Sequence, residues 1–309
     1  MANPLLTSAL NLANFTADGV WQKAIKSGAL ARLAGQDPEI RVGSTDFFTF
    51  TTTPKAELVG EGANKASADG TPTKVTSKTY KVQLTYRVSD EILIADREHQ
   101  IRLIEALRGR IGTGISRALD SIAIYGINPA AGTVSANVAN YFMKANNGVD
   151  HQVPGTGSTP TTLIKGAAGA LAGAGYNATG LAVDPAFVNA LANETEGSTN
   201  NRPLYPELGL GFNIESFQGL RAASSDTVSG KNELAASYTG KVANAIMGDF
   251  NAFKWAIAEE VPLHLIQYGD PDGAGDLQRT NEVAIRAEAY IGFAIMDGAA
   301  FSVIEKASA

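Results

Sequence analysis

The fold is decided by one continuous stretch of the chain, Tyr80-Lys81-Val82-Gln83-Leu84-Thr85-Tyr86-Arg87-Val88, which is followed directly by Ser89-Asp90-Glu91. In the first nine residues, aromatic and aliphatic side chains alternate with polar ones, and this period of two predicts a β-strand with one apolar face. Ser89 is a typical helix cap, and the two acidic residues after it suit the positive end of a helix dipole. We therefore expect the strand to pass directly into a helix.

That helix is predicted to run from Ser89 to about Tyr125. One apolar stripe supports it, formed by Ile104, Leu107, Ile111, Ile115, Leu119 and Ile122 at helical spacing. A helix of this length spans roughly 50 Å and would act as a spine for its domain. Three glycines lie inside it, and we predict that they make the spine bendable or allow close backbone packing: Gly109, Gly112 and Gly114.

A second strand is predicted upstream, at 47–52, where aromatic and β-branched residues alternate before Pro54. The connection between the two strands is polar and rich in turn residues, so the pair is interpreted as a projecting hairpin. An isolated two-stranded hairpin is marginally stable in water, and no third strand follows nearby in the sequence. We expect the hairpin to lie on another surface, and another subunit is a candidate.

The rest of the chain alternates short helices and strands. Small residues at 162–174 predict a helix, and Gly180–Asp184 predicts a buried strand that leads into a helix at Pro185. Strand character returns at 242–255 and 261–268, and 283–291 alternates again. These patterns predict a compact α/β unit in the middle of the chain and a long strand pair near its end.

Composition excludes several classes of site. The chain has 309 residues, 44% hydrophobic and 18% charged, and it contains no cysteine, which excludes disulfides, Cys-ligated zinc, iron–sulfur clusters and a thiol nucleophile. The N-terminus lacks the pattern of a signal peptide, and no apolar run approaches the roughly 18 residues of a membrane helix. We expect a protein that stays in the cytoplasm where it is made.

No residue pattern predicts catalysis or cofactor binding. The three histidines, His99, His151 and His264, have no ligand-like neighbours, and the HExxH, GxSxG and GxxxxGK[ST] motifs are absent. The acidic segment 270–276 has some similarity to a calcium loop, but its twelfth position is Asn281 rather than Glu. We interpret that segment as a hairpin turn, with a weak cation site as the alternative.

Charge is distributed unevenly. The net charge of −6 argues against a protein that grips nucleic acid with its whole surface, yet residues 1–125 carry +2 and the remainder −8. The hairpin has a run of basic residues without an acid between Thr73 and Val88: Lys74, Lys78, Lys81 and Arg87. Such residues can contact phosphates or attract the acidic part of a neighbouring copy, and we favour the second interpretation.

The order of these parts resembles the major capsid proteins of tailed bacteriophages, which have the Hong Kong 97-type shell fold. Several phrases are similar to that family over about 47–304, namely 78–84 followed by 88–93, Arg202-Pro203-Leu204-Tyr205, Gly248-Asp249-Phe250 and 283–288. The resemblance implies an α+β fold made of an N-terminal arm (1–43), an extended hairpin loop (44–88), a peripheral domain with the spine helix (89–159), an axial α/β domain (160–250) and returning strands (251–309).

The function implied by the resemblance is that of a structural, non-enzymatic shell subunit without cofactor or metal. It would assemble into hexamers and pentamers of an icosahedral virion shell around double-stranded DNA, contacted non-specifically, with scaffolding, portal and decoration proteins as further partners. Inter-subunit contacts would involve Lys55, Glu61, Lys65, Lys74, Lys78, Lys81 and Arg87.

Two features of the family need a separate statement for this chain, the covalent cross-link and the scaffold, and two alternative functions stay open. Some relatives join a loop lysine covalently to a neighbouring subunit, but nothing near Lys55 or Lys65 identifies a partner, and we predict no such bond. The chain does not begin with a long charged helix, so a separate scaffolding protein or a processed form is expected. The alternatives are an encapsulin-like compartment that encloses cargo enzymes and, less favoured, a cytosolic hydrolase.

Overall fold

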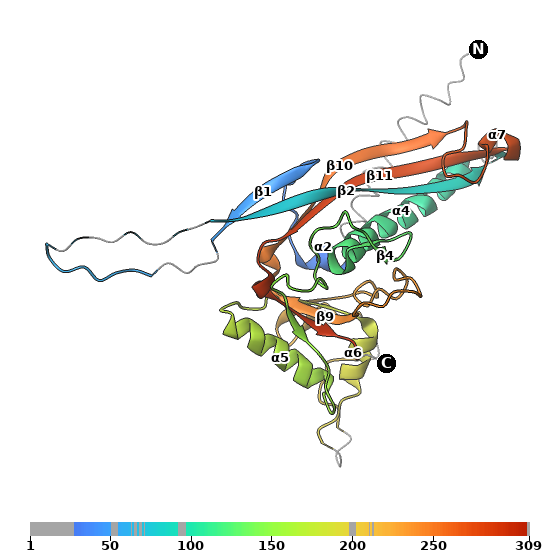
Figure 1. Ribbon diagram of the computed structural model, residues 1–309. Helices are drawn as coiled ribbons and strands as arrows, with labels where there is room; N and C mark the ends of the chain where they lie inside the picture. The colour runs from blue at the N-terminus through green and yellow to red at the C-terminus, as the bar shows by residue number, and fades with distance from the viewer. Residues whose placement is uncertain are drawn as a thin grey trace.

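The computed structural model describes residues 28–50, 55–62, 64, 67, 70, 72–91, 97–197, 202–209, 211 and 213–307. These residues form two main sheets, one long and one short, arranged one above the other in Figure 1. The long sheet has the strand order β1-β2-β11-β10. Its strands are β1 (Ser44–Thr49), β2 (Thr73–Ser89), β11 (Glu282–Ile295) and β10 (Phe253–Ile266).

The hairpin expected from the sequence is present, and it has a third strand within its own chain. β1 pairs antiparallel with the first part of β2, from Ser44 opposite Lys78 to Thr49 opposite Thr73. β2 then pairs with β11 from Lys78 opposite Phe293 to Ser89 opposite Glu282. The hairpin was expected to lie on another surface, with another subunit as a candidate, and at its base that surface is a strand of the same chain about 200 residues later.

The spine helix is α4 (Arg97–Tyr125), which runs along one face of the long sheet (Figure 1). Its stripe residues Ile111, Ile115, Leu119 and Ile122 are buried as predicted, and the side chain of Ile104 lies outside the described residues. Ser89, the predicted cap, is the last residue of β2, Glu91 is helical, and residues 92–96 lie outside the described residues. The Ser89 Oγ still accepts a hydrogen bond from the Glu91 N–H at 3.3 Å, as a cap would.

The short sheet has the order β5-β12-β9-β6-β8-β7 and is covered by two helices (Figure 1). Its strands are β5 (Asp150–Gln152), β12 (Phe301–Glu305), β9 (Ala243–Gly248), β6 (Gly180–Val183), β8 (Leu220–Ser224) and β7 (Ser216–Phe217). The helices are α5 (Pro160–Gly173), capped by Thr159, and α6 (Pro185–Ala192), capped by Asp184. The predicted strand-to-helix passage at Pro185 is confirmed.

Short elements connect these layers. They are α2 (Ala29–Leu33), β3 (Ile127–Asn128), β4 (Thr133–Val134), α7 (Leu277–Thr280) and two 3-10 turns at Phe250–Ala252 and Gly298–Ala300. The acidic segment after β10 leads into α7 and β11, so the predicted hairpin turn is confirmed.

Aromatic residues join the two sheets into one core. Phe253 begins β10 in the long sheet, Phe301 begins β12 in the short sheet, and Phe142 lies between them at ring-centroid distances of 5.5 and 5.0 Å. All three side chains are almost fully buried. Edge-on and tilted contacts of this kind add to the burial of apolar area, so the two sheets are packed as parts of one subunit.

A buried carboxylate fastens the chain near its N-terminus to the spine. Asp120 of α4 accepts hydrogen bonds from the backbone N–H groups of Ala29 and Leu30 at 2.8 and 3.2 Å and from the Thr227 hydroxyl at 2.7 Å. Its side chain is fully buried, and this burial raises the pKa of Asp120 to about 6, although the three donors act in the opposite direction. The negative charge of Glu233, which pairs with Arg117, raises the pKa of Asp120 further.

The raised pKa of Asp120 predicts a specific pH dependence of subunit stability. The folded chain binds this proton more tightly than the unfolded chain, whose Asp pKa is near 3.8, so the contribution is fully present below about pH 4 and is lost as the pH rises through about 6. Each pH unit in that window corresponds to about 1.4 kcal/mol, which gives about 3 kcal/mol in total. Asp120→Asn should remove this part of the slope when unfolding of the unassembled subunit is measured between pH 4 and 7.

Asp226 provides the matched control for that measurement. Hydrogen bonds from Arg117 lower its pKa, so its stabilising contribution is present above the unfolded pKa and is lost as the pH falls through the folded value. Asp226→Asn should therefore leave the slope between pH 4 and 6 in place. Equal slopes in the wild type and in Asp120→Asn would contradict the assignment.

Candidate assembly surface

A two-stranded arm extends from the body of the subunit. β1 and the first part of β2 form it, and residues 55–62 lie at its far end, away from both sheets (Figure 1). Large apolar side chains on the arm face solvent: Phe48 is 67% exposed, Phe50 66% and Leu58 100%. Exposed apolar residues gathered on one projection are typical of an interaction surface, and the body of the same chain does not cover them.

Phe47 shows how the arm is anchored at its base. Its side chain is 6% exposed, and the Lys254 ammonium lies 4.7 Å from the ring centroid. Because strand side chains alternate between faces, Phe48, the next residue, points to the opposite side. One face of β1 is thus fixed on the subunit and the other is presented outward.

The predicted contact residues of the arm differ in their surroundings. Lys55 and Glu61 are exposed near the tip, Lys78 is exposed on β2, and Lys65 lies outside the described residues. Lys74 forms an ion pair of 2.8 Å with Asp46 on the neighbouring strand. The hydrogen bond from Lys74 lowers the pKa of Asp46 below its ordinary value.

Lys81 also has an acidic partner in its own chain. Its ammonium lies 2.7 Å from the carboxylate of Glu288 on β11, and this hydrogen bond raises the pKa of Lys81 above its ordinary value. The two residues stand on adjacent strands of the long sheet, so the pair follows directly from the β2–β11 register. The polar face of β2 is thus partly neutralised before any second copy is present.

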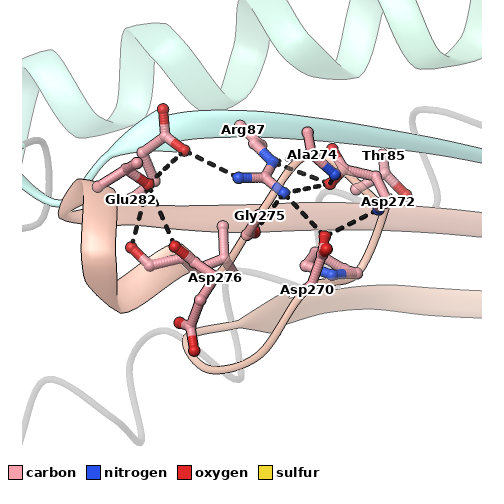
Figure 2. A network of polar contacts seen from close by, with 12 residues as sticks. Thr85, Arg87, Asp270, Asp272, Ala274, Gly275, Asp276 and Glu282 are labelled. Atoms are coloured by element: carbon pink, nitrogen blue, oxygen red, sulfur yellow. Dashed lines mark hydrogen bonds and ion pairs between the residues drawn. The ribbon is translucent and has the colours of Figure 1, made fainter.

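Arg87 is the centre of a denser polar cluster (Figure 2), which we call the Arg87 cluster: Arg87, Asp270, Asp272, Gly275 and Glu282. The guanidinium Nε donates to both carboxylate oxygens of Asp272 at 2.9 Å, and Nη1 donates to Glu282 at 3.1 Å. Nη2 donates to Asp270 at 3.2 Å, to the Gly275 carbonyl at 2.8 Å and to Asp272. The hydrogen bonds from Arg87 lower the pKa of Asp272 to about 2, and those to Asp272 raise the pKa of Arg87.

This cluster brings together two features that the sequence showed separately, the acidic segment 270–276 and the basic residue Arg87. The acidic loop that was considered as a weak cation site surrounds a cation of the same chain, the guanidinium of Arg87. Arg286 of β11 also donates to this loop, to the carbonyl of Pro271. The sequence suggested that the acidic part of a neighbouring copy attracts Arg87. In the structure, acidic residues of the same chain bind it instead. An inter-subunit role for the seven contact residues stays a prediction.

Gly114 permits a close approach of the spine to β2. A Cβ atom at this position would lie 2.7 Å from the Leu84 Cδ1, closer than atoms in contact normally lie. Close packing is therefore one reason for a glycine here, and the flexibility of Gly109, Gly112 and Gly114 stays a prediction.

Within the described part of the chain, no group of three or more His, Cys, Asp or Glu side chains is arranged to hold a metal ion. His151 lies 3.0 Å from Glu305, which also pairs with Lys241 at 2.7 Å, and this cluster connects β5 to the end of β12. The helices in this part of the chain are too short or too polar to cross a membrane.

Comparisons with known proteins agree with this architecture. The family model described as the phage capsid family matches residues 10–306. A solved chain from Mycobacterium phage Ogopogo is 38% identical, with a TM-score of 0.77, and the match covers 91% of this chain and 93% of that one. A chain from Gordonia phage Cozz is 25% identical, with a TM-score of 0.73 and coverage of 91% and 86%. The capsid of an empty GTA particle shares the fold at 18% identity, with a TM-score of 0.62 and coverage of 91% and 90%. No curated protein sequence matches the chain.

The Arg87 cluster predicts that Arg87→Gln frees the acidic loop. Three carboxylates would then lose their shared cation, so residues 269–276 should exchange their amide hydrogens faster and the pKa of Asp272 should rise toward its ordinary value near 4. Hydrogen exchange of the unassembled subunit measures the first effect. Lys74→Gln, which removes a single exposed ion pair on the arm, is the control and should leave the loop unchanged. Unchanged loop exchange in Arg87→Gln would contradict the assignment.

Proposed function

The chain belongs to the phage capsid family, and from that premise we propose how this major capsid protein builds its shell. Its place is in the virion capsid, and the family is one of structural proteins. The proposal is that subunits associate into hexamers and pentamers of a closed icosahedral shell that encloses double-stranded DNA. An encapsulin-like compartment is not favoured, since the family match is to phage capsids.

The observation that carries this proposal is the exposed arm. Phe48, Phe50 and Leu58 would each lose unfavourable contact with water if another copy covered them, and burying such a side chain fully is worth about 1.5–3 kcal/mol. The chain has no cysteine, so disulfides cannot join its subunits. Apolar contacts repeated around a ring of subunits would stabilise such a shell by burial and interlocking. We assign residues 44–88 as the extended loop that reaches a neighbouring subunit.

The remaining parts receive the following roles. Residues 89–159, together with the returning strands β10 and β11, would form the peripheral domain, and 160–250 with β12 would form the axial domain around the capsomer centre. Residues 1–43 would form the N-terminal arm. The net charge of −6 favours non-specific and local contacts with packaged DNA rather than tight binding over the whole surface. A scaffolding protein, a portal protein and a decoration protein are proposed partners.

Assembly itself is the first test of the proposal. The purified protein, co-expressed with candidate scaffolding proteins if needed, should form large closed particles that electron microscopy and sedimentation detect. Only stable monomer under every assembly condition would contradict a shell function.

The second test concerns the tip of the arm. Deleting 61–70 should leave the melting temperature of the unassembled subunit nearly unchanged, because the described residues of this segment are exposed. The yield of capsomers should fall, because the shortened loop would no longer reach its neighbour. A control in which 61–70 is replaced by ten Gly and Ser residues separates the length of the loop from its side chains. Normal assembly of the deletion variant would show that the assigned role of the loop is wrong.

A further inference from the structure

The acidic loop, residues 270–276, contains an Asp-Gly step at Asp272-Gly273. Both residues are exposed, and Gly273 has a φ of +80°. A Cβ atom at Gly273 would meet no atom of the described residues within 4 Å, so nothing packs against this peptide unit. Exposed Asp-Gly steps are where a backbone most readily isomerises without an enzyme, because glycine neither shields its nitrogen nor restricts its rotation.

The isomerisation needs only the chain and water. The Gly273 nitrogen attacks the Cγ atom of a protonated Asp272 carboxyl, and the amide proton and the carboxyl hydroxyl leave as one water molecule. The resulting five-membered succinimide takes up one water at either carbonyl, which restores aspartate or forms isoaspartate, whose backbone runs through Cγ. An ionised carboxylate reacts poorly because it is a weaker electrophile. The reaction therefore depends on protonation of Asp272 and on rotation of the Gly273 peptide unit.

Arg87 opposes the first of these requirements. Its Nε donates to both carboxylate oxygens of Asp272 at 2.9 Å, and its Nη2 donates to the same carboxylate (Figure 2). These hydrogen bonds lower the pKa of Asp272 to about 2, so the reactive protonated form is rare at neutral and weakly acidic pH. Arg87 also binds Asp270 and Glu282, which fixes the position of its guanidinium.

Asp270 opposes the second requirement. Gly273 donates its N–H to the Asp270 Oδ1 at 2.8 Å, and the same oxygen accepts from Arg87 Nη2 at 3.2 Å. The Ala274 N–H donates to the Asp272 Oδ1 at 3.3 Å. These bonds hold the peptide units on both sides of Gly273 and restrict the rotation that ring closure needs. Arg87 thus acts on the carboxyl group directly and on the attacking nitrogen through Asp270.

Two similar steps of the described chain are held in other ways. Asp297-Gly298 is half-buried, and the Asp297 carboxylate accepts from the Tyr176 hydroxyl at 2.6 Å. At Asn147-Gly148, the side-chain amide of Asn147 donates to the Tyr141 carbonyl at 2.7 Å. The partners at these two steps are uncharged. Within the described residues, the step at 272 is the one that an arginine holds.

We propose that Asp272-Gly273 is a latent isomerisation site and that Arg87 preserves it as aspartate. An assembled virion does not replace its subunits, so isoaspartate would accumulate with the age of the particle. Each event adds one backbone atom between β10 and β11 and moves the carboxylate away from Arg87. The inference goes beyond the proposed function and does not depend on how the subunits assemble.

Ageing of the purified full-length chain tests the proposal. Wild type and Arg87→Gln are incubated at about pH 5, and trypsin then releases the peptide 255–279, which contains the step. Chromatography with mass spectrometry, together with labelling by a protein isoaspartate methyltransferase, measures isoaspartate in that peptide. Arg87→Gln should form it at least about tenfold faster, because the pKa of Asp272 returns toward its ordinary value near 4.

Control variants separate this effect from a general loosening of the sheet. Lys81→Gln removes another ion pair of β2, with Glu288, and should leave the rate unchanged. Asp272→Glu added to Arg87→Gln keeps an acid that cannot form a five-membered ring here, so the isoaspartate signal should disappear. Arg87→Lys keeps the charge without the planar fork and should give an intermediate rate.

The same digest provides an internal reference, because the peptides 145–165 and 287–306 contain the steps at 147 and 297. Equal rates at 272 in wild type and Arg87→Gln would overturn the proposal, and so would a rise of the same size at all three steps. A synthetic peptide of residues 266–276 lacks Arg87 and needs no folded variant. The wild-type chain should isomerise at least about tenfold more slowly than this peptide, and the same rate in both would overturn the assignment even if no variant folds.

Discussion

The pairing of β2 with β11 is the constraint on which the rest of the subunit depends. Twelve consecutive residue pairs join a strand from the first third of the chain to one near its end. This register supports the base of the arm, because a two-stranded hairpin alone would be only marginally stable in water. It also fixes the direction in which the arm leaves the body. It also places the polar face of β2 against acidic side chains that are remote in sequence, Glu288 for Lys81 and the Arg87 cluster for Arg87.

The pairing of β2 with β11 changes the interpretation of the uneven charge distribution along the chain. A basic hairpin and an acidic remainder suggested attraction between copies, but Lys74, Lys81 and Arg87 meet acids of their own chain. The pair of Lys74 and Asp46 is exposed, and such pairs contribute little to stability. The side chains of Glu288 and Arg87 are only 14% and 15% exposed, so their ion pairs are better shielded from solvent. The exposed side chains of the arm also include the apolar residues Phe48, Phe50 and Leu58, so the proposed contact between copies would have an apolar part.

Local signals in the sequence predicted a large part of the fold. Alternation predicted β2 and β11, helical spacing predicted the buried stripe of α4, and Pro185 after a buried run predicted the passage from β6 to α6. Ser89 is both the last residue of β2, paired with Glu282, and the acceptor of the Glu91 N–H, so one residue ends the strand and makes the cap contact that the sequence predicted. Asp120 was not recognised, since a single acid beside an apolar stripe gives no sign of which remote N–H groups it will accept.

The sequence by itself determined the identity of the elements, the absence of cysteine chemistry and the resemblance to phage capsid proteins, because periodicity, composition and the order of parts are properties of neighbouring residues. Tertiary structure alone decided which strand supports the hairpin and which cation fills the acidic loop. Both depend on residues separated by 100 or more positions. Pairing over such distances is selected by the packing of the whole core, which no local pattern encodes.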